Sequence, residues 1–85
     1  MDKDIYVLVA KNIKYYRKKK NITQKVLAEL TDFSYEYIRR IEAPNTSKYF
    51  SLNTIYIISK SLDIDIQKLF EERVKEDGSK KLLSK

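Results

Sequence analysis

The stretch TQKVLAELTDFSYEYIRRIEAPN (residues 23–45) contains two short amphipathic segments with almost no connection between them. Thr23 and Ser34 each precede apolar residues at helical spacing, and serine and threonine are favoured residues at helix N-caps. Pro44 ends the second segment, because the residue before a proline is disfavoured in the helical region. Only about two residues then remain between the helices, and so short a connection makes them cross steeply, which is the helix-turn-helix geometry.

The second of these helices has two chemically distinct sides. At about 100° per residue, its long polar side chains fall within about 140° of one another. They are Tyr35, Glu36, Arg39 and Arg40. The apolar residues Tyr37, Ile38 and Ile41 occupy the opposite side. One side is therefore expected to pack on a core while the other presents hydrogen-bonding groups.

The other segments also have a helical pattern, at about residues 4–20, 51–62 and 65–74. Apolar residues expected to face the core in the helices outside residues 34–43 include Ile5, Val9, Ile13, Tyr16, Val26, Leu27, Leu30, Leu52, Ile55, Ile58, Leu62, Ile66 and Leu69. Ser51 and Asp65 are expected N-caps, and one glycine and one proline argue against an all-β fold. The sequence predicts an all-α domain of five short helices over residues 1–76, followed by a flexible or partner-ordered tail over 77–85.

The composition excludes several classes of function. The 85 residues contain no cysteine and no histidine, so thiolate and imidazole chemistry is absent, and neither an enzyme nor a metal or cofactor site is expected. No apolar run is long enough for a membrane span, which favours a cytoplasmic protein. The net charge is +6, with eleven Lys/Arg against six Asp/Glu in residues 1–50. This basic N-terminal part indicates either a polyanion partner or a charge that only maintains solubility.

The segment NITQKVLAELTDFSYEYIRRIE resembles the Cro/cI-type (XRE) helix-turn-helix family of transcriptional regulators, whose DNA-binding domain is lambda-repressor-like. The matching residues are Ile22, Thr23, Gln24, Leu27, Ala28, Ser34, Tyr37, Ile38, Arg40, Ile41, Glu42, Ser51, Leu52, Thr54, Ile55, Leu62, Ile64, Leu69 and Phe70. The resemblance covers roughly residues 9–70. It implies a compact five-helix fold and a regulator that binds double-stranded DNA, with residues 34–43 forming the helix that enters the major groove.

The resemblance also implies which residues contact bases. They are Tyr35, Glu36, Arg40 and Gln24. Arg40 can donate two parallel hydrogen bonds to guanine, Glu36 can accept from cytosine N4, and Tyr35 can pack on a thymine methyl group or bind phosphate. An intrahelical ion pair between Glu36 and Arg40 is an alternative role, and it is compatible with base contact.

Phosphate contacts are expected from the starts of helices and from the loop after Pro44. The residues are Lys25, Ser34, Arg39, Asn45, Thr46, Ser47, Lys48, Tyr49 and Ser51. For the loop residues the alternative is a solvated turn, and Arg39 is equally compatible with plain exposure. The resemblance further implies a structural ion pair between Arg17 and Glu42, and left-handed backbone at Asp32 and Asp63, where the family has glycine.

The family usually binds near-palindromic sites as a two-fold dimer, so the resemblance implies a repressor that acts as a homodimer. Ile57, Phe70 and Val74 are candidate dimer contacts, and ordinary core packing is the alternative for them. A second hypothesis is an antitoxin or anti-repressor whose C-terminal tail binds a protein partner.

Overall fold

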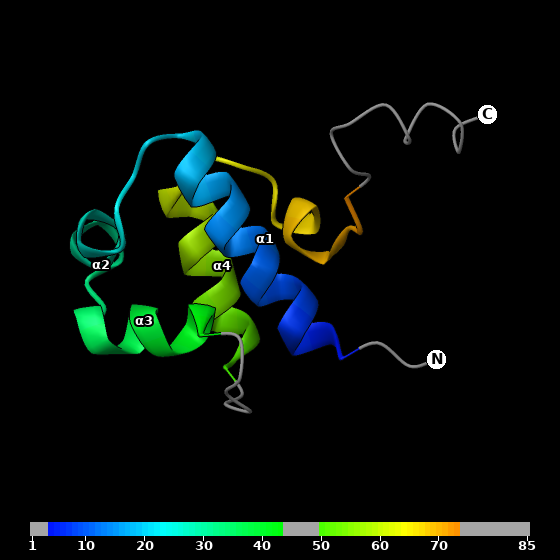
Figure 1. Cartoon of the computed structure of the whole chain (residues 1–85), viewed down its shortest axis with the longest axis horizontal. Coiled ribbons are helices and arrows are strands. Elements are labelled where there is room, and N and C mark those ends of the chain that lie inside the picture. The colour runs from blue at the N-terminus through cyan, green and yellow to red at the C-terminus, as the bar shows by residue number, and fades with distance from the viewer. Residues whose placement is uncertain (1–3, 44–49, 74–85) are drawn as a thin grey trace.

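Four α-helices and one 3₁₀-helix form the described part of the chain, residues 4–43 and 50–73 of a computed structural model (Figure 1). In chain order they are α1 Ile5–Lys19, α2 Gln24–Thr31, α3 Tyr35–Glu42, α4 Leu52–Ser61 and η1 Ile66–Phe70. α3 packs against α1 and α2, α4 packs against α2, and η1 packs against α1 and α4. The predicted all-α, lambda-repressor-like class is confirmed. Within these residues no helix has the length and apolar character needed to cross a membrane.

Side-chain oxygens cap all four α-helices, because the first backbone N–H groups of a helix have no partner within it. The caps are Asp4, Thr23, Ser34 and Ser51, which accept from the backbone N–H groups of Tyr6, Val26, Tyr37 and Thr54 at 2.9–3.1 Å. The capping predictions for α2, α3 and α4 are therefore confirmed. These caps fix where each helix begins, and the cap at Ser34 fixes where the turn between α2 and α3 ends.

The fifth predicted helix is not an α-helix. Residues Ile66–Phe70 form a short 3₁₀-helix, and the predicted cap Asp65 makes no side-chain hydrogen bond to it. The side-chain amide of Asn12 in α1 donates to the carbonyl oxygens of Leu69 (2.9 Å) and Glu71 (2.8 Å). In a longer α-helix the carbonyl oxygen of Leu69 would accept from the backbone N–H four residues later. Because it accepts from the side chain of Asn12 instead, a short 3₁₀-helix is favoured here.

Asn12 ties the C-terminal part of the described chain to α1. It is only 1% exposed, and its side-chain oxygen accepts from Nε of Arg73 at 2.7 Å. The guanidinium carbon of Arg73 lies 3.8 Å from the ring centroid of Tyr15, one turn further along α1. All hydrogen-bonding groups of the buried amide thus have partners, as a buried polar side chain requires.

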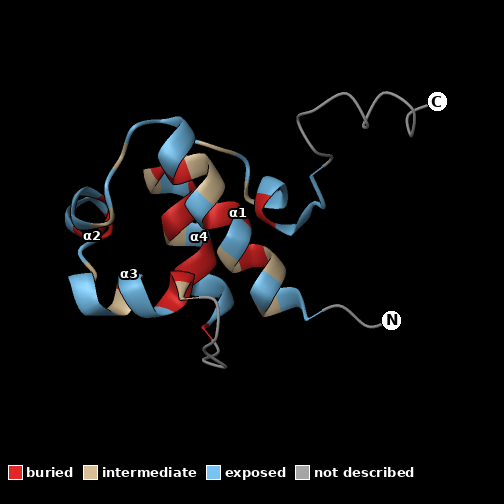
Figure 2. Cartoon of the chain, viewed as in Figure 1, coloured by how far each residue is buried: buried red, intermediate tan, exposed pale blue. Residues whose placement is uncertain are grey.

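The core runs through every helix (Figure 2). Its buried hydrophobic residues are Val9, Ile13, Leu27, Ala28, Ile38, Ile41, Phe50, Ile55, Ile58, Leu62 and Leu69. Four apolar residues expected in the core are instead exposed, namely Ile5, Leu52, Val26 and Leu30. Ile5 and Leu52 are the first residues of their helices. In α2 the buried side is set by Leu27, Ala28 and Thr31, which leaves Val26 and Leu30 facing outward.

Within residues 4–43 and 50–73, three non-glycine residues have left-handed backbone. Asp32 (φ 70°) and Asp63 (φ 58°) confirm the prediction made from the family glycines, and Asn21 (φ 59°) is a third that the prediction did not include. Asp32 ends α2 and reverses the chain toward α3. Aspartate and asparagine tolerate this region better than other residues with a Cβ atom, so the tight turn forms without glycine.

Replacing Asp32 by valine is expected to lower the free energy of unfolding by about 1–2 kcal/mol, because a β-branched residue is strongly disfavoured at positive φ. Urea unfolding followed by circular dichroism would measure the change. Asp32→Gly is the matched control and is expected to be at least as stable as the parent chain. Equal stability of the valine and glycine variants would contradict the proposed origin of the turn.

Candidate nucleic-acid interface

α3 has one buried and one exposed side, as the helical wheel predicts. Ile38 is 0% exposed and Ile41 is 3% exposed. The opposite side carries the exposed side chains Tyr35, Glu36, Arg39 and Arg40. Because the core fixes the apolar side, the rotation of α3 about its own axis is set and the four polar side chains point to solvent.

Contacts on either side of the turn hold the start of α3 in place. The Phe33 and Tyr37 rings meet edge to face with centroids 5.1 Å apart. The hydroxyl oxygen of Thr31 accepts from the backbone N–H of Phe33 at 3.2 Å. The hydroxyls of Tyr37 and Thr54 are 3.1 Å apart, which connects α3 to α4. Contacts with the turn and with α4 therefore hold the start of α3 in place.

A buried ion pair connects α1 to the end of α3. Nε and Nη2 of Arg17 donate to the two carboxylate oxygens of Glu42 at 2.7 and 2.9 Å, and both side chains are less than a tenth exposed. Nη1 of Arg17 also donates to the carbonyl of Ile22 at 2.8 Å. This is the geometry that the family resemblance implied for these two residues.

Gln24, the first residue of α2, joins the same network. Its Nε2 donates to Oε1 of Glu42 at 3.0 Å, a bond that the sequence did not predict. Within residues 4–43 and 50–73, the second N–H and the carbonyl oxygen of this amide have no hydrogen-bond partner. Gln24 is therefore oriented by the ion pair while part of it stays available to DNA.

The charged groups of α3 pair differently from the sequence expectation. Glu36 lies 3.5 Å from Nη1 of Arg39, an i,i+3 contact, and not next to Arg40. Among residues 4–43 and 50–73, Arg40 is exposed and has no hydrogen-bond or ion-pair partner. The alternative of a Glu36–Arg40 intrahelical pair is wrong. The five N–H donors of Arg40 are free to bind an external acceptor.

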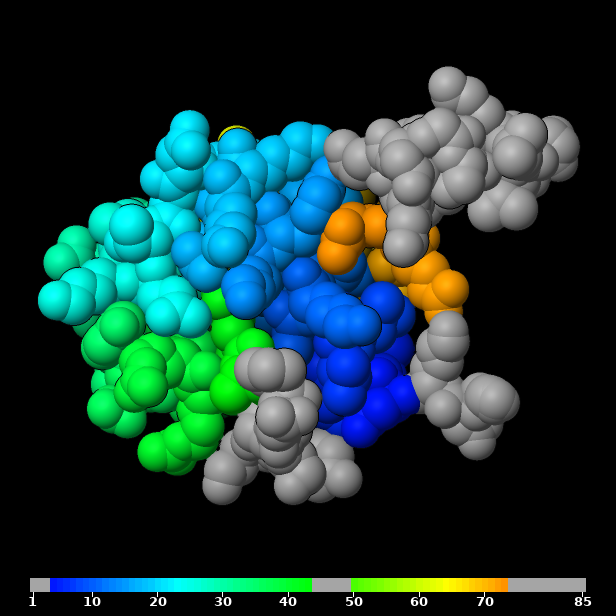
Figure 3. All heavy atoms as spheres, in the orientation of Figure 1, coloured from blue at the N-terminus to red at the C-terminus, as the bar shows by residue number. Residues whose placement is uncertain are grey.

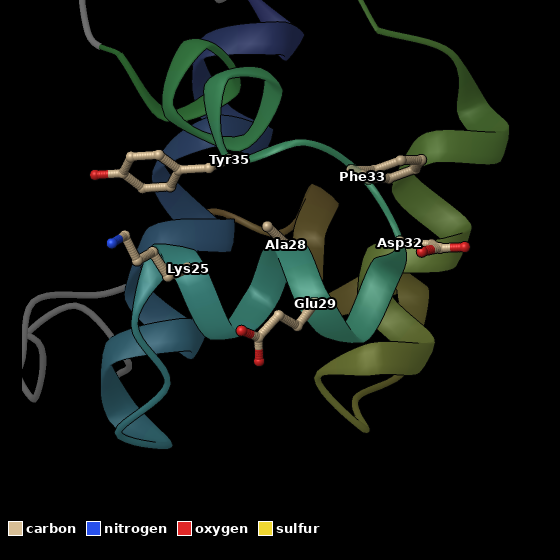
Figure 4. Close-up of a pocket in the computed structure, with 6 residues that line it drawn as sticks. All are labelled: Lys25, Ala28, Glu29, Asp32, Phe33 and Tyr35. Atoms are coloured by element: carbon tan, nitrogen blue, oxygen red, sulfur yellow. The ribbon is translucent and has the colours of Figure 1, made fainter.

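Tyr35 lies between two cations at the entrance to α3. Nζ of Lys25 is 5.6 Å and the guanidinium carbon of Arg39 is 5.7 Å from its ring centroid, within the range of cation–π attraction. The side chain of Tyr35 is 41% exposed and, in Figure 4, extends toward the same side as that of Lys25. Both border a shallow hollow between α2 and α3, which is also lined by Ala28, Glu29, Asp32 and Phe33. The ring is thus held in one orientation without being covered.

Of the predicted phosphate-contacting residues, Lys25, Ser34, Arg39 and Ser51 lie within the described chain and are all exposed. The hydroxyl oxygens of Ser34 and Ser51 serve as helix caps, and Ser51 also donates to the hydroxyl of Thr54 at 3.2 Å. The loop residues Asn45, Thr46, Ser47, Lys48 and Tyr49 lie outside the described residues.

The helix-turn-helix family (HTH_3) matches residues 13–69, which include all of α2 and α3. The chain belongs to this family. It is a DNA-binding helix-turn-helix protein of the Cro/cI type, and the match covers the buried ion pair, the turn and the exposed side of α3 together.

Two relatives of this helix-turn-helix chain are control proteins. The chain is 32% identical over 66 residues to "Control protein C.SmaI" of Serratia marcescens, covering 78% of this chain and 76% of that protein. The crystal structure of the restriction-modification controller protein C.AhdI from Aeromonas hydrophila is 26% identical. It has a TM-score of 0.70, with 76% of this chain and 96% of that chain covered.

A third relative is similar in fold alone. The crystal structure of a hypothetical transcription factor, NHTF, from Neisseria has a TM-score of 0.74 at 18% identity, with 96% of this chain and 86% of that chain covered. The helix-turn-helix arrangement is therefore retained at low sequence identity.

Proposed function

We propose that the chain is a sequence-specific regulator of transcription that represses by binding a near-palindromic operator as a homodimer. In this proposal α3 lies in the major groove, where Tyr35, Glu36 and Arg40 read base edges and Gln24 contacts the edge of the site. Lys25, Ser34, Arg39 and Ser51 bind phosphates and fix the register of the helix.

The observation that carries the proposal is the unpaired guanidinium of Arg40 on a helix whose other side is buried. Glu36 and Tyr35 hold Arg39, so the neighbouring Arg40 is left as the free bidentate donor. Guanine offers the acceptors O6 and N7 to such a donor in the major groove.

In vitro selection of bound DNA from a random duplex library tests the proposal. Enrichment of a two-fold symmetric sequence with half-sites about 10 bp apart is the expected result. Enrichment of an asymmetric sequence would contradict the dimer part, and no enrichment would contradict sequence-specific binding altogether. The second outcome would favour the antitoxin or anti-repressor hypothesis, in which a protein is the main partner.

The C-terminal half offers apolar side chains for the dimer contact. Ile57 on α4 is half-buried, its neighbour Tyr56 is 50% exposed, and Phe70 at the end of η1 is 37% exposed. α4 and η1 pack on each other, which supports one continuous interface. Val74, the third predicted contact, lies outside the described residues. A two-fold axis that passes close to Ile57 would bring Ile57 close to its own copy in the second protomer.

Ile57→Glu is expected to weaken self-association by about 100-fold, because two like charges would meet across the two-fold axis at a cost of several kcal/mol. A concentration series in sedimentation equilibrium would show the variant as a 10.1 kDa monomer where the parent chain is a dimer. Leu30→Glu, at an exposed apolar position of α2, is the control and is expected to leave the association unchanged. A dimer of unchanged affinity for Ile57→Glu would exclude Ile57 from the interface.

Similarity to the restriction-modification controller protein C.AhdI supports a narrower role, the control of restriction-modification genes. A reporter fused to DNA upstream of such genes would test this role and the sign of regulation together. Repression that is lost on substitution of Arg40 is the expected result. An increase in expression would contradict repression and would show that the chain activates these genes.

A further inference from the structure

A row of lysines lies on the solvent side of α1. Lys11, Lys14 and Lys18 are all exposed, and at about 100° per residue they fall within about 60° of one another. We refer to these three residues as the lysine stripe. α1 contains no aspartate or glutamate, so nothing in the helix itself balances their charge.

The lysine stripe has no counter-charge elsewhere in residues 4–43 and 50–73, since no ion pair there joins any of its members to a carboxylate. Like charges three and four residues apart repel one another and destabilise a helix. Attraction of cations to the C-terminal end of the helix dipole explains only Lys18 in the last turn, because this effect fades within one turn. Lys11 and Lys14 need another explanation.

Two lysines in the C-terminal half provide a contrast. Lys60 and Lys68 border one shallow hollow together with Asp63 and Asp65, so positive and negative groups alternate there. A surface that needed charge only for solubility could have the same mixture on α1. α1 differs from this hollow, because none of its own residues is acidic.

The lysine stripe lies next to the candidate interface. On the wheel of α1, Lys14 is about 60° from Arg17, and Arg17 is the residue that binds Glu42 at the end of α3. Glu42 in turn holds Gln24 at the start of α2. In the space-filling view, α1, α2 and α3 form one continuous face of the molecule (Figure 3). A polyanion on α2 and α3 therefore has a short path to the lysine stripe.

We propose that the lysine stripe is a second phosphate-binding surface, which holds the operator duplex outside the base pairs that α3 reads. The proposal rests on the DNA binding proposed above. Each lysine that neutralises a phosphate releases a condensed counterion, so the contact has a measurable salt dependence and requires no particular base sequence. The lysine stripe then adds affinity only when the duplex extends beyond the read half-sites.

The experiment compares two double variants on two duplexes. Lys14→Gln/Lys18→Gln removes two charges from the lysine stripe, and Lys60→Gln/Lys68→Gln removes two charges at the balanced hollow. One duplex is the operator from in vitro selection, and the other is the same operator extended by one helical turn (about 10 bp) on each side. Fluorescence anisotropy at several salt concentrations gives affinities and salt slopes, and thermal unfolding checks that both variants fold.

The parent chain and the Lys60/Lys68 variant are expected to bind the extended duplex more tightly than the minimal operator. The Lys14/Lys18 variant is expected to lose at least tenfold in affinity for the extended duplex and to bind the minimal operator as the parent does. Because the proposed dimer loses two lysines from each protomer, its salt slope on the extended duplex should be smaller by about 4. Equal affinity of both variants for the extended duplex would overturn the proposal. A loss of the same size on both duplexes would overturn the location outside the read base pairs.

Failure of the proposed function gives a different result. In that case the parent chain itself selects no sequence and binds the two duplexes no better than unrelated DNA. If only the proposal for the lysine stripe is wrong, the parent chain still selects a sequence, and the two double variants bind the extended duplex with the same affinity.

Discussion

Arg40→Ala is expected to relax the base preference at one position of each half-site and to leave the fold unchanged. Two parallel hydrogen bonds from an arginine to guanine contribute about 1–3 kcal/mol of discrimination, so preference for that base should fall by roughly 5–150-fold. The fold should persist because Arg40 is exposed and contacts no hydrogen-bond partner in the described residues. In vitro selection repeated with the variant measures the change directly.

Arg39→Ala is the matched control, since it removes the same side chain from the adjacent position. Arg39 already contacts Glu36 and Tyr35, and it is assigned to a phosphate. Its loss is expected to weaken binding to all sequences about equally and to lower the salt slope by about two units, one for each protomer of the proposed dimer. If instead Arg39→Ala changes the selected base and Arg40→Ala does not, the two roles are reversed.

Glu42→Gln is expected to lower the free energy of unfolding by about 3–5 kcal/mol, because it leaves the Arg17 guanidinium buried without a counter-charge. The side chains of Arg17 and Glu42 are 7% and 2% exposed, so water cannot replace the lost carboxylate. A domain of this size has a total stability of about 5–15 kcal/mol, and the variant would therefore lie close to unfolding. Urea titration of the purified variant measures the loss.

The double variant Arg17→Met/Glu42→Leu separates the cost of a lone charge from the net contribution of the pair. Well-packed apolar residues often replace a buried ion pair with little loss, so the double variant is expected to recover most of the stability. Its DNA affinity should stay reduced, because Gln24 would have lost the carboxylate that orients it. A single variant as stable as the parent would show that the ion pair is not the connection between α1 and α3.

It could be predicted which side of α3 is buried and where the capped α-helices begin, because each of these features depends on residues close together in the sequence. A cap needs one hydroxyl or carboxylate and the N–H groups that follow it, as Ser34 and Tyr37 illustrate. The apolar spacing of Ile38 and Ile41 is similarly local, and it fixes which side of α3 is buried. The positive φ of Asp32 followed from the family resemblance together with the tolerance of aspartate for that region.

Features that depend on distant parts of the chain could not be predicted. Leu30 and Leu52 fit a helical stripe, yet the neighbouring helices do not reach them, so both are exposed. Asn12 gave no signal in the sequence, because its partners Leu69 and Glu71 are almost sixty positions away. Whether Glu36 pairs with Arg39 or with Arg40 likewise depends on side-chain rotamers, which the sequence spacing alone does not determine.

The hydrogen bonds from Asn12 to the carbonyl oxygens of Leu69 and Glu71 have a consequence for folding during synthesis. α1 is synthesised before η1, and the groups that satisfy its buried amide are among the last described residues to follow. Until residue 73 has emerged, the amide of Asn12 has only water to bind and one flank of α1 stays uncovered. The fold around α1 is therefore completed only after residues 69–73 have been synthesised, so products that end before them lack the closed domain that presents α3 to DNA.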